Sequence, residues 1–198
     1  AGYDTGVFGS WKLGGPQTSG MPIDQGFEES YGYLSRDHAR NYFPNYLWRN
    51  DLREPIPGNQ NNAREHFSLE LVTDEAVEYI QRRRRRPFFL TVLFAPPRNN
   101  LADVPNLEPY ANENWPREQK QYAAMISRVD DAVGEIMDTL YRLRMKENTV
   151  VILTSDNGPH KEGVDPEFFD SNGPFNGIKG TLAEGGIRVP MIVWGHSG

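Results

Sequence analysis

A short apolar run that ends in an Asp-Asn-Gly turn constrains the fold of this chain more than any other feature. Residues 149–154 read T-V-V-I-L-T, a β-branched run with the length and composition of a buried strand. The next residues are of types that favour a sharp turn: Ser155, Asp156, Asn157 and Gly158. Because ligands bind at the carboxyl ends of strands in open α/β sheets, a carboxylate and a carboxamide are predicted to lie side by side at such an edge.

Two interpretations of Asp156 and Asn157 are open at this point. Both side chains offer oxygen ligands, one charged and one neutral, which suits Ca²⁺ or Mg²⁺ better than Zn²⁺. Alternatively, Asp-Asn-Gly is simply a good turn in which the carboxylate accepts backbone N–H bonds. The tripeptide alone favours the plain turn.

A second block changes that balance. Residues 177–179 read G-I-K and residues 184–190 read E-G-G-I-R-V-P. In order, spacing and residue type, the two blocks together resemble the sulfatase family of the alkaline-phosphatase-like superfamily, in particular arylsulfatase-type bacterial members. The resemblance implies that Asp156 and Asn157 are ligands of Ca²⁺ or Mg²⁺, and that Lys179 contacts the sulfate.

Three other residues of these blocks are weaker candidates. His160 follows the turn and either lines the pocket or has a structural role. Glu184 and Arg188 are expected to pair with each other or with the backbone rather than to touch substrate.

The N-terminal region also resembles the family. A short strand at residues 5–9 leads into W-K-L-G-G at residues 11–15, where sulfatases have a G-K-W-x-L-G loop. The family lysine falls on Ser10, which can donate a hydrogen bond but carries no charge. Residues 10 and 12 of an extended segment point to the same face, so we expect Lys12 to supply the cation beside Ser10. The alternative is a solvated surface lysine.

A second buried strand is predicted at residues 88–94, F-F-L-T-V-L-F. In the family the corresponding strand ends in Pro-His, and that histidine assists the chemistry. Here Pro97 follows Pro96, and proline has no acid–base group. The adjacent Arg98 is a candidate anion ligand, although it stays protonated and cannot shuttle protons.

Helical spacing of apolar residues predicts helices at residues 68–84 and 117–145, and residues 51–66 have the composition of a loop. Strand, helix and strand in that order predict that residues 88–94 and 149–154 pair in parallel in an α/β fold. The resemblance implies an alkaline-phosphatase-like three-layer sandwich with a mostly parallel central sheet, of which residues 1–198 form part.

Composition limits the function classes. The chain has 198 residues, enough for one domain, and a net charge of −6, which argues against general nucleic-acid binding. Five arginines at residues 82–86 invite a polyanion-binding interpretation, but a cationic helix C-terminus that complements the dipole is favoured. There is no cysteine, and no apolar run has the length of a membrane span.

The sulfatase nucleophile is a formylglycine made from Cys or Ser in a C/S-x-P-x-R motif, which does not occur in the 198 residues. We therefore expect an internal part of a single sulfatase catalytic domain, with the N-terminal strands and the C-terminal subdomain outside it. The implied function is metal-dependent hydrolysis of a sulfated small molecule or glycan by the complete protein. Two alternatives stay open: a phosphoester hydrolase, and a non-catalytic protein that binds sulfated glycans through Lys12, Arg98 and Lys179.

Overall fold

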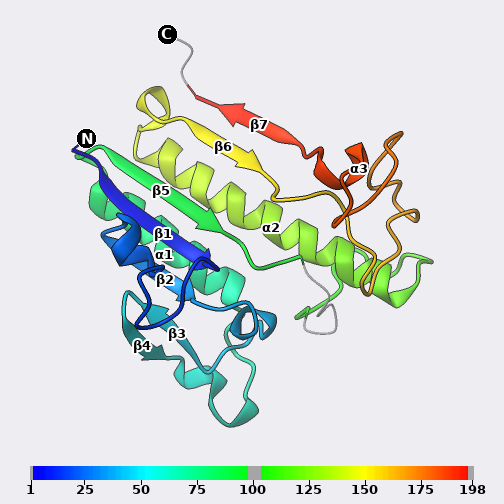
Figure 1. Cartoon of the computed structure of the whole chain (residues 1–198), viewed down its shortest axis with the longest axis horizontal. Helices are drawn as coiled ribbons and strands as arrows, with labels where there is room; N and C mark the ends of the chain where they lie inside the picture. Colours follow the sequence, from blue (N-terminus) through cyan, green and yellow to red (C-terminus); the bar gives the residue numbers. More distant parts are fainter. Residues whose placement is uncertain (1, 98–103, 196–198) are drawn as a thin grey trace.

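The structure, a computed structural model, describes residues 2–97 and 104–195 (Figure 1). Its main sheet has the strand order β4-β3-β2-β1-β5, and β6 and β7 form a separate two-stranded sheet. The strands are β1 (Asp4–Ser10), β2 (Glu29–Tyr33), β3 (Tyr46–Arg49), β4 (Leu52–Pro55), β5 (Phe88–Leu93), β6 (Val151–Thr154) and β7 (Met191–Trp194). The α-helices are α1 (Ser68–Arg83), α2 (Arg117–Arg142) and the short α3 (Glu184–Ile187).

Strand β1 lies between β2 and the edge strand β5 of the main sheet and is buried on both faces. It pairs in parallel with β2 and with β5, so that Phe8 lies opposite Tyr31 on one side and Val92 on the other. Because side chains alternate along a strand, Phe8 packs into the core under α1, whereas Val7 packs with Trp11 on the opposite face.

Helices α1 and α2 pack against each other on one face of the main sheet (Figure 1). Val72, Ala76 and Tyr79 on α1 contact the Phe8 core, and the Tyr79 ring meets the Phe8 ring edge-on at 5.4 Å between centroids. Both helices confirm predictions from apolar spacing. The predicted strands at residues 88–94 and 149–154 also form, as β5 and β6.

The prediction of a loop at residues 51–66 is wrong, because β4 pairs antiparallel with β3 in this region. The two strands are joined at Asn50, which has a φ of 53° and accepts a hydrogen bond from the Ser30 N–H through its side chain. Polar side chains hide this strand in the sequence, since Arg53 and Glu54 face solvent or an ion pair rather than a core.

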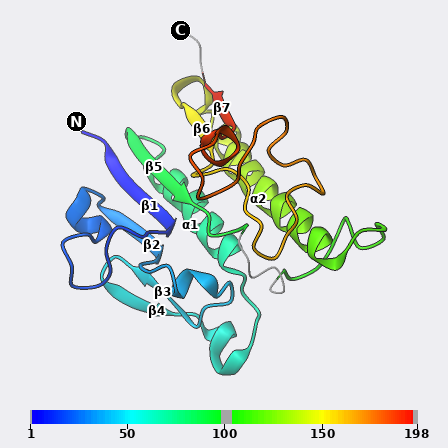
Figure 2. The same cartoon turned by 45° about the vertical axis from the view of Figure 1, so that its right-hand side comes forward.

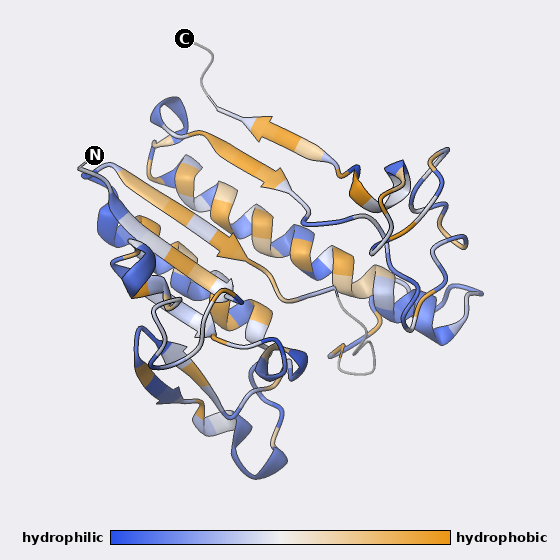
Figure 3. Ribbon diagram, viewed as in Figure 1, coloured by the Kyte–Doolittle hydropathy of each residue, from blue (hydrophilic) through white to orange (hydrophobic). Residues whose placement is uncertain are grey.

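The predicted parallel pairing of the strands at residues 88–94 and 149–154 is also wrong. Strands β5 and β6 run in the same direction (Figure 1), yet β6 is hydrogen-bonded only to the antiparallel β7 within the part of the chain that the structure describes. The predicted burial of β6 fails for the same reason: Ile152 is 58% exposed. Apolar residues dominate both strands of the small sheet (Figure 3), and several of them are exposed.

The arginine run binds carboxylates of its own chain. Arg82 contacts Glu29 at 2.8 Å and Glu75 at 3.2 Å, and Arg83 and Arg86 contact the buried Asp4 at 3.3 and 3.0 Å. These ion pairs join the C-terminal end of α1 to the beginnings of β1 and β2. They support the structural interpretation of the run, with acidic partners as well as the helix dipole stabilising the arginines.

Over residues 2–97 and 104–195, no helix combines the length and the apolar character that a membrane crossing requires.

Candidate functional site

The candidate residues lie where strands deliver the chain to one edge. Strands β1 and β5 are parallel neighbours in the main sheet (Figures 1 and 2), and β6 of the small sheet runs in the same direction in Figure 1, so the three carboxyl ends point to the same side of the molecule. Ser10 is the last residue of β1, and Asp156 follows β6. This is the edge at which open α/β sheets bind ligands.

The turn after β6 presents its two candidate ligands away from the core. Asp156 is exposed and Asn157 is half-buried. The Asn157 amide nitrogen donates to the Gly158 carbonyl at 2.9 Å, and the Ser155 hydroxyl donates to the Asn157 carbonyl at 3.0 Å. Because the amide nitrogen is used inside the turn, Oδ1 is the Asn157 atom that can face a cation.

Backbone hydrogen bonds join this turn to the segment around Lys179. The Gly158 N–H donates to the Gly186 carbonyl at 3.0 Å, and the Lys179 N–H donates to the Pro159 carbonyl at 2.8 Å. The Gly185 N–H donates to the Asn176 carbonyl at 2.8 Å. The Asp-Asn-Gly turn and the two blocks that follow it are thus one backbone unit.

Three glycines make this close packing possible. A Cβ on Gly158 would lie 1.9 Å from the Gly185 carbonyl oxygen, and one on Gly185 would lie 2.3 Å from the Gly177 carbonyl oxygen. A Cβ on Gly186 would lie 2.5 Å from the Thr181 carbonyl oxygen. Any side chain at these positions would push the segments apart.

The expected pairing of Glu184 with Arg188 is confirmed. Arg188 Nε donates to Glu184 Oε2 at 2.8 Å, across one turn of the short helix α3. The guanidinium also lies over the Phe175 ring at 4.4 Å. This pair holds α3 to the preceding loop.

The other candidates differ in their exposure. Lys179 and Lys12 are exposed, whereas Ser10 is only 5% exposed and its hydroxyl oxygen is buried. His160 is half-buried, with both ring nitrogens inside the protein. Arg98 lies outside the described residues. The structure thus joins the backbone of the Lys179 segment to the turn of Asp156 and Asn157, while a shared site of the three side chains, and a common cleft with Lys12 and Ser10, stay predictions.

Comparison with known proteins decides the family. The family model for Sulfatase matches residues 1–198. This chain belongs to the sulfatase family. Human N-acetylgalactosamine-6-sulfatase is 32% identical over 211 residues, which cover 99% of this chain and 38% of the relative. Arylsulfatase of Hemicentrotus pulcherrimus is 30% identical over 98% of this chain and 36% of its own length.

Solved sulfatase structures confirm the alkaline-phosphatase-like α/β fold. PsFucS1 sulfatase from Pseudoalteromonas sp. has a TM-score of 0.70 and 27% identity, over 98% of this chain and 42% of that one. Ps i-CgsB in complex with k-i-k-neocarrahexaose has a TM-score of 0.70 and 25% identity, over 98% and 45% of the two chains. This sulfatase chain therefore spans less than half the length of each of these four relatives.

The residues of this sulfatase chain fit part of a hard-cation site. Asp156 and Asn157 would supply two oxygen ligands, whereas Ca²⁺ takes six to eight. Over the described ranges, no three or more His, Cys, Asp or Glu side chains come together as a metal site. The remaining ligands of a complete site would have to be other groups.

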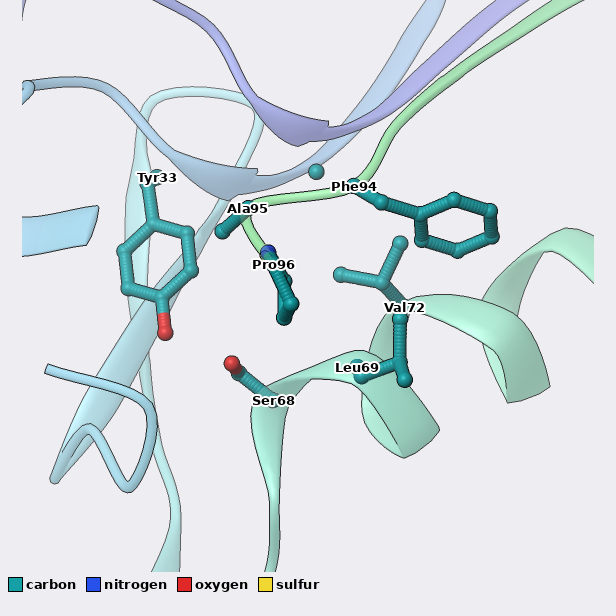
Figure 4. Close-up of a pocket in the computed structure, with 8 residues that line it drawn as sticks. Tyr33, Ser68, Leu69, Val72, Phe94, Ala95 and Pro96 are labelled. Carbon is teal, nitrogen blue, oxygen red and sulfur yellow. The ribbon is translucent and has the colours of Figure 1, made fainter. Parts of the chain in front are cut away.

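A pocket at the same edge of the strands lies between β1, β5 and the beginning of α1 (Figure 4). Its lining is apolar apart from the hydroxyl groups of Tyr33 and Ser68. The lining residues are Gly9, Tyr33, Ser68, Leu69, Val72, Phe94, Ala95 and Pro96. The Tyr33 hydroxyl donates to the Asn41 carbonyl at 2.6 Å, and burial raises the Tyr33 pKa. Among the described residues, none of the candidate site residues lines this pocket, although Gly9 of its lining adjoins Ser10.

Two polar side chains beside Lys179 were missed by sequence reasoning. The Asn172 amide donates to the Phe175 and Gly177 carbonyls, and the Thr181 hydroxyl donates to the Ile178 carbonyl. The local signal was present, because an asparagine beside Gly and Pro favours bonds from its side chain to the backbone.

Proposed function

We propose that this protein is a sulfuric ester hydrolase in which Asp156, Asn157 and Lys179 form one side of the site. The observation that carries the proposal is the hydrogen bond from the Lys179 N–H to the Pro159 carbonyl, together with the bond from Gly158 to Gly186. These bonds place the lysine segment directly beside the turn that offers oxygen ligands.

Each of the three side chains has a distinct role. The Asp156 carboxylate and the Asn157 amide oxygen would be two ligands of Ca²⁺ or Mg²⁺. When bound, the cation would neutralise negative charge on the sulfate oxygens. The Lys179 ammonium would hold the same group and stabilise the charge that builds on it during cleavage. The formylglycine nucleophile of the family would have to come from polypeptide other than residues 1–198.

The proposed substrate is a sulfated small molecule or glycan. Two comparisons support this class: one relative is named for an N-acetylgalactosamine 6-sulfate activity, and one solved neighbour holds a neocarrahexaose. His160, Ser10, Lys12 and Arg98 are the further substrate contacts that we propose.

A second candidate is a sulfatase homologue that binds sulfated glycans without hydrolysing them. Two positions favour it. Ser10, which is buried and uncharged, occupies the place of the family lysine, and Pro97 occupies the place of the family histidine. Lys12 and Lys179, both exposed, would then provide the cationic contacts, together with Arg98.

Titration of this chain with sulfate tests the site. Chemical shifts of the Lys179 side chain, followed by NMR, should move with sulfate in the wild type, and Lys179→Gln should abolish binding. Lys161→Gln is the matched control, because Lys161 is an exposed lysine of the neighbouring loop. Equal loss in the two variants would mean non-specific charge attraction, and the proposal would fail.

Turnover separates the two candidates. A longer polypeptide that contains residues 1–198 together with a formylglycine should hydrolyse an aryl sulfate if the first candidate holds. Binding without hydrolysis by that polypeptide would favour the second.

A further inference from the structure

We propose that Asn172 is a positioning residue for Lys179; this role rests on the proposed sulfate contact of Lys179. The Asn172 side-chain nitrogen donates two hydrogen bonds, to the Phe175 carbonyl at 2.7 Å and to the Gly177 carbonyl at 3.0 Å. The side chain is half-buried, so both bonds are partly shielded from water. Asn172 holds the chain immediately before the lysine.

The segment that Asn172 holds needs an external support. Gly177 has a φ of 92°, and glycine has few conformational restraints of its own. Three successive carbonyls of residues 175–177 are fixed from outside: Asn172 binds the first and third, and the Gly185 N–H binds the second at 2.8 Å. Without Asn172, only the Gly185 bond would remain among these three.

Lys179 is thus fixed at three points. Before it, Asn172 holds Gly177. At the residue itself, the Lys179 N–H binds Pro159. After it, the Thr181 hydroxyl binds the Ile178 carbonyl at 2.8 Å, which closes the turn locally. Of the two side chains in this arrangement, Asn172 reaches further along the chain, since its bond to Gly177 spans five residues whereas the Thr181 bond to Ile178 spans three.

The role depends on the lysine's own flexibility. A lysine has a long stem with many rotamers, so the position of its ammonium group depends on how firmly its backbone is held. Binding and transition-state stabilisation both require that group to be placed accurately. Asn172 would therefore act through Lys179 without touching the sulfate.

The chemistry of the support requires an amide. Asn172 donates two N–H groups to two carbonyl oxygens, whereas an ionised carboxylate has no proton to donate. Asn172→Asp has nearly the same shape but would set a negative oxygen against two carbonyl oxygens. Both hydrogen bonds from the residue 172 side chain should be lost in this variant, although the side-chain volume is preserved.

Amide hydrogen exchange in this chain tests the proposal, with Asn176→Asp as the matched control. Asn176 lies in the same loop and is exposed, so its variant adds the same charge without removing the two hydrogen bonds that Asn172 donates. We expect the Lys179 N–H to exchange about tenfold faster in Asn172→Asp and Asn172→Ala, because local opening becomes easier. The control should match the wild type, and amides of β1 should keep their protection in every variant.

Acid pH adds a readout that a general packing role would not change. Relative to the wild type at the same pH, Asn172→Asp should regain part of the Lys179 protection once its carboxyl is protonated and can donate again. Asn172→Ala should regain none. Sulfate affinity should fall severalfold more in Asn172→Asp than in Asn176→Asp.

Each other outcome decides against the proposal. Unchanged Lys179 exchange in both Asn172 variants, or an equal increase in the Asn176 control, would overturn it. Loss of β1 protection in the Asn172 variants would also overturn it, because the residue would then support the whole fold. If the wild type fails to bind sulfate, the proposed function fails, while the exchange results still decide whether Asn172 positions Lys179.

Discussion

The Lys179 N–H donates a hydrogen bond to the Pro159 carbonyl, with 2.8 Å between nitrogen and oxygen. Pro159 belongs to the chain that leaves the Asp156 turn, so the lysine is placed relative to the turn by the backbone itself. The segment of the proposed sulfate contact and the turn of the proposed cation ligands thus form a single backbone unit.

Gly158→Ala should disrupt this unit. The new Cβ would lie 1.9 Å from the Gly185 carbonyl oxygen, a distance at which the two segments must separate. We expect Lys179 and Gly158 to lose their amide-exchange protection. Protection that matches the wild type would contradict the close packing of these glycines.

Gly134→Ala is the matched control for a glycine with no such role. Gly134 lies inside α2, and its added Cβ would meet nothing within 4 Å. Alanine should stabilise the helix by about 1 kcal/mol relative to glycine. Urea unfolding measures the change. Destabilisation by Gly134→Ala would contradict the open space beside Gly134.

Stability should fall in mild acid because of His38. Burial lowers the pKa of this imidazole; Arg53 also lowers it, while a hydrogen bond with the Tyr46 backbone opposes the shift. An unfolded histidine has a pKa of about 6.5, so the stabilisation is fully present above that pH and is lost as pH falls through the folded-state pKa. Unfolding free energies at pH 7.5 and pH 5.5 should show the decrease.

Two variants separate His38 from other acid effects. His38→Phe should retain more of its stability between the two pH values, because the ring stays packed between Tyr33 and Tyr46 and cannot be protonated. His66→Gln, at an exposed histidine, should behave as the wild type does. The account of His38 is wrong if all three proteins lose the same stability.

Local signals predicted the elements whose residues carry their own pattern. Apolar spacing located α1 and α2, an apolar run located β5, and a β-branched run ending in turn residues located β6. Strand pairing was not predictable in the same way, because β6 pairs with β7 across about forty residues of chain. The sequence of β4 lacks apolar alternation, since ion pairs and its neighbour β3 support it.

In the site, too, local motifs predicted some residues, whereas others depend on contacts that form only in the folded chain. Motif resemblance selected Asp156, Asn157 and Lys179, and the structure places the lysine backbone beside the turn. Asn172 was missed because its partners are backbone carbonyls, whose positions depend on the folded loop. Whether Lys12 replaces the family lysine at Ser10 depends on a loop path that local sequence does not specify.

The small sheet should cause this chain to self-associate. Ile152 and Val193 are cross-strand partners, each 58% exposed, and Met191 is 64% exposed. Exposed apolar strands promote edge-to-edge and face-to-face association, which we expect at concentrations on the order of 100 μM. Sedimentation velocity should show the association.

Charged substitutions identify the surface responsible. The double variant Ile152→Lys with Val193→Lys should be largely monomeric, because both charges lie on one face of the sheet. Leu13→Lys, which changes an exposed leucine in a distant loop, should associate as the wild type does. A monomeric wild type at the same concentration would disprove this expectation.

This chain should not turn over a chromogenic aryl sulfate. Covalent catalysis requires its nucleophile, and neither a cysteine nor a Ser-x-Pro-x-Arg motif occurs in the 198 residues. The rate of product formation should match that of the double variant Asp156→Ala with Lys179→Ala. Hydrolysis clearly above this control would mean that residues 1–198 contain a nucleophile of another kind.

Calcium titration calorimetry tests most directly whether the Asp156 turn is part of a cation site. Two side-chain ligands out of the six to eight that Ca²⁺ prefers should give a dissociation constant of about 1 mM or weaker. Asp156→Ala should abolish the binding, and Asp131→Ala, at an exposed carboxylate on α2, should leave it unchanged. Sub-micromolar affinity, or binding that survives Asp156→Ala, would contradict the account.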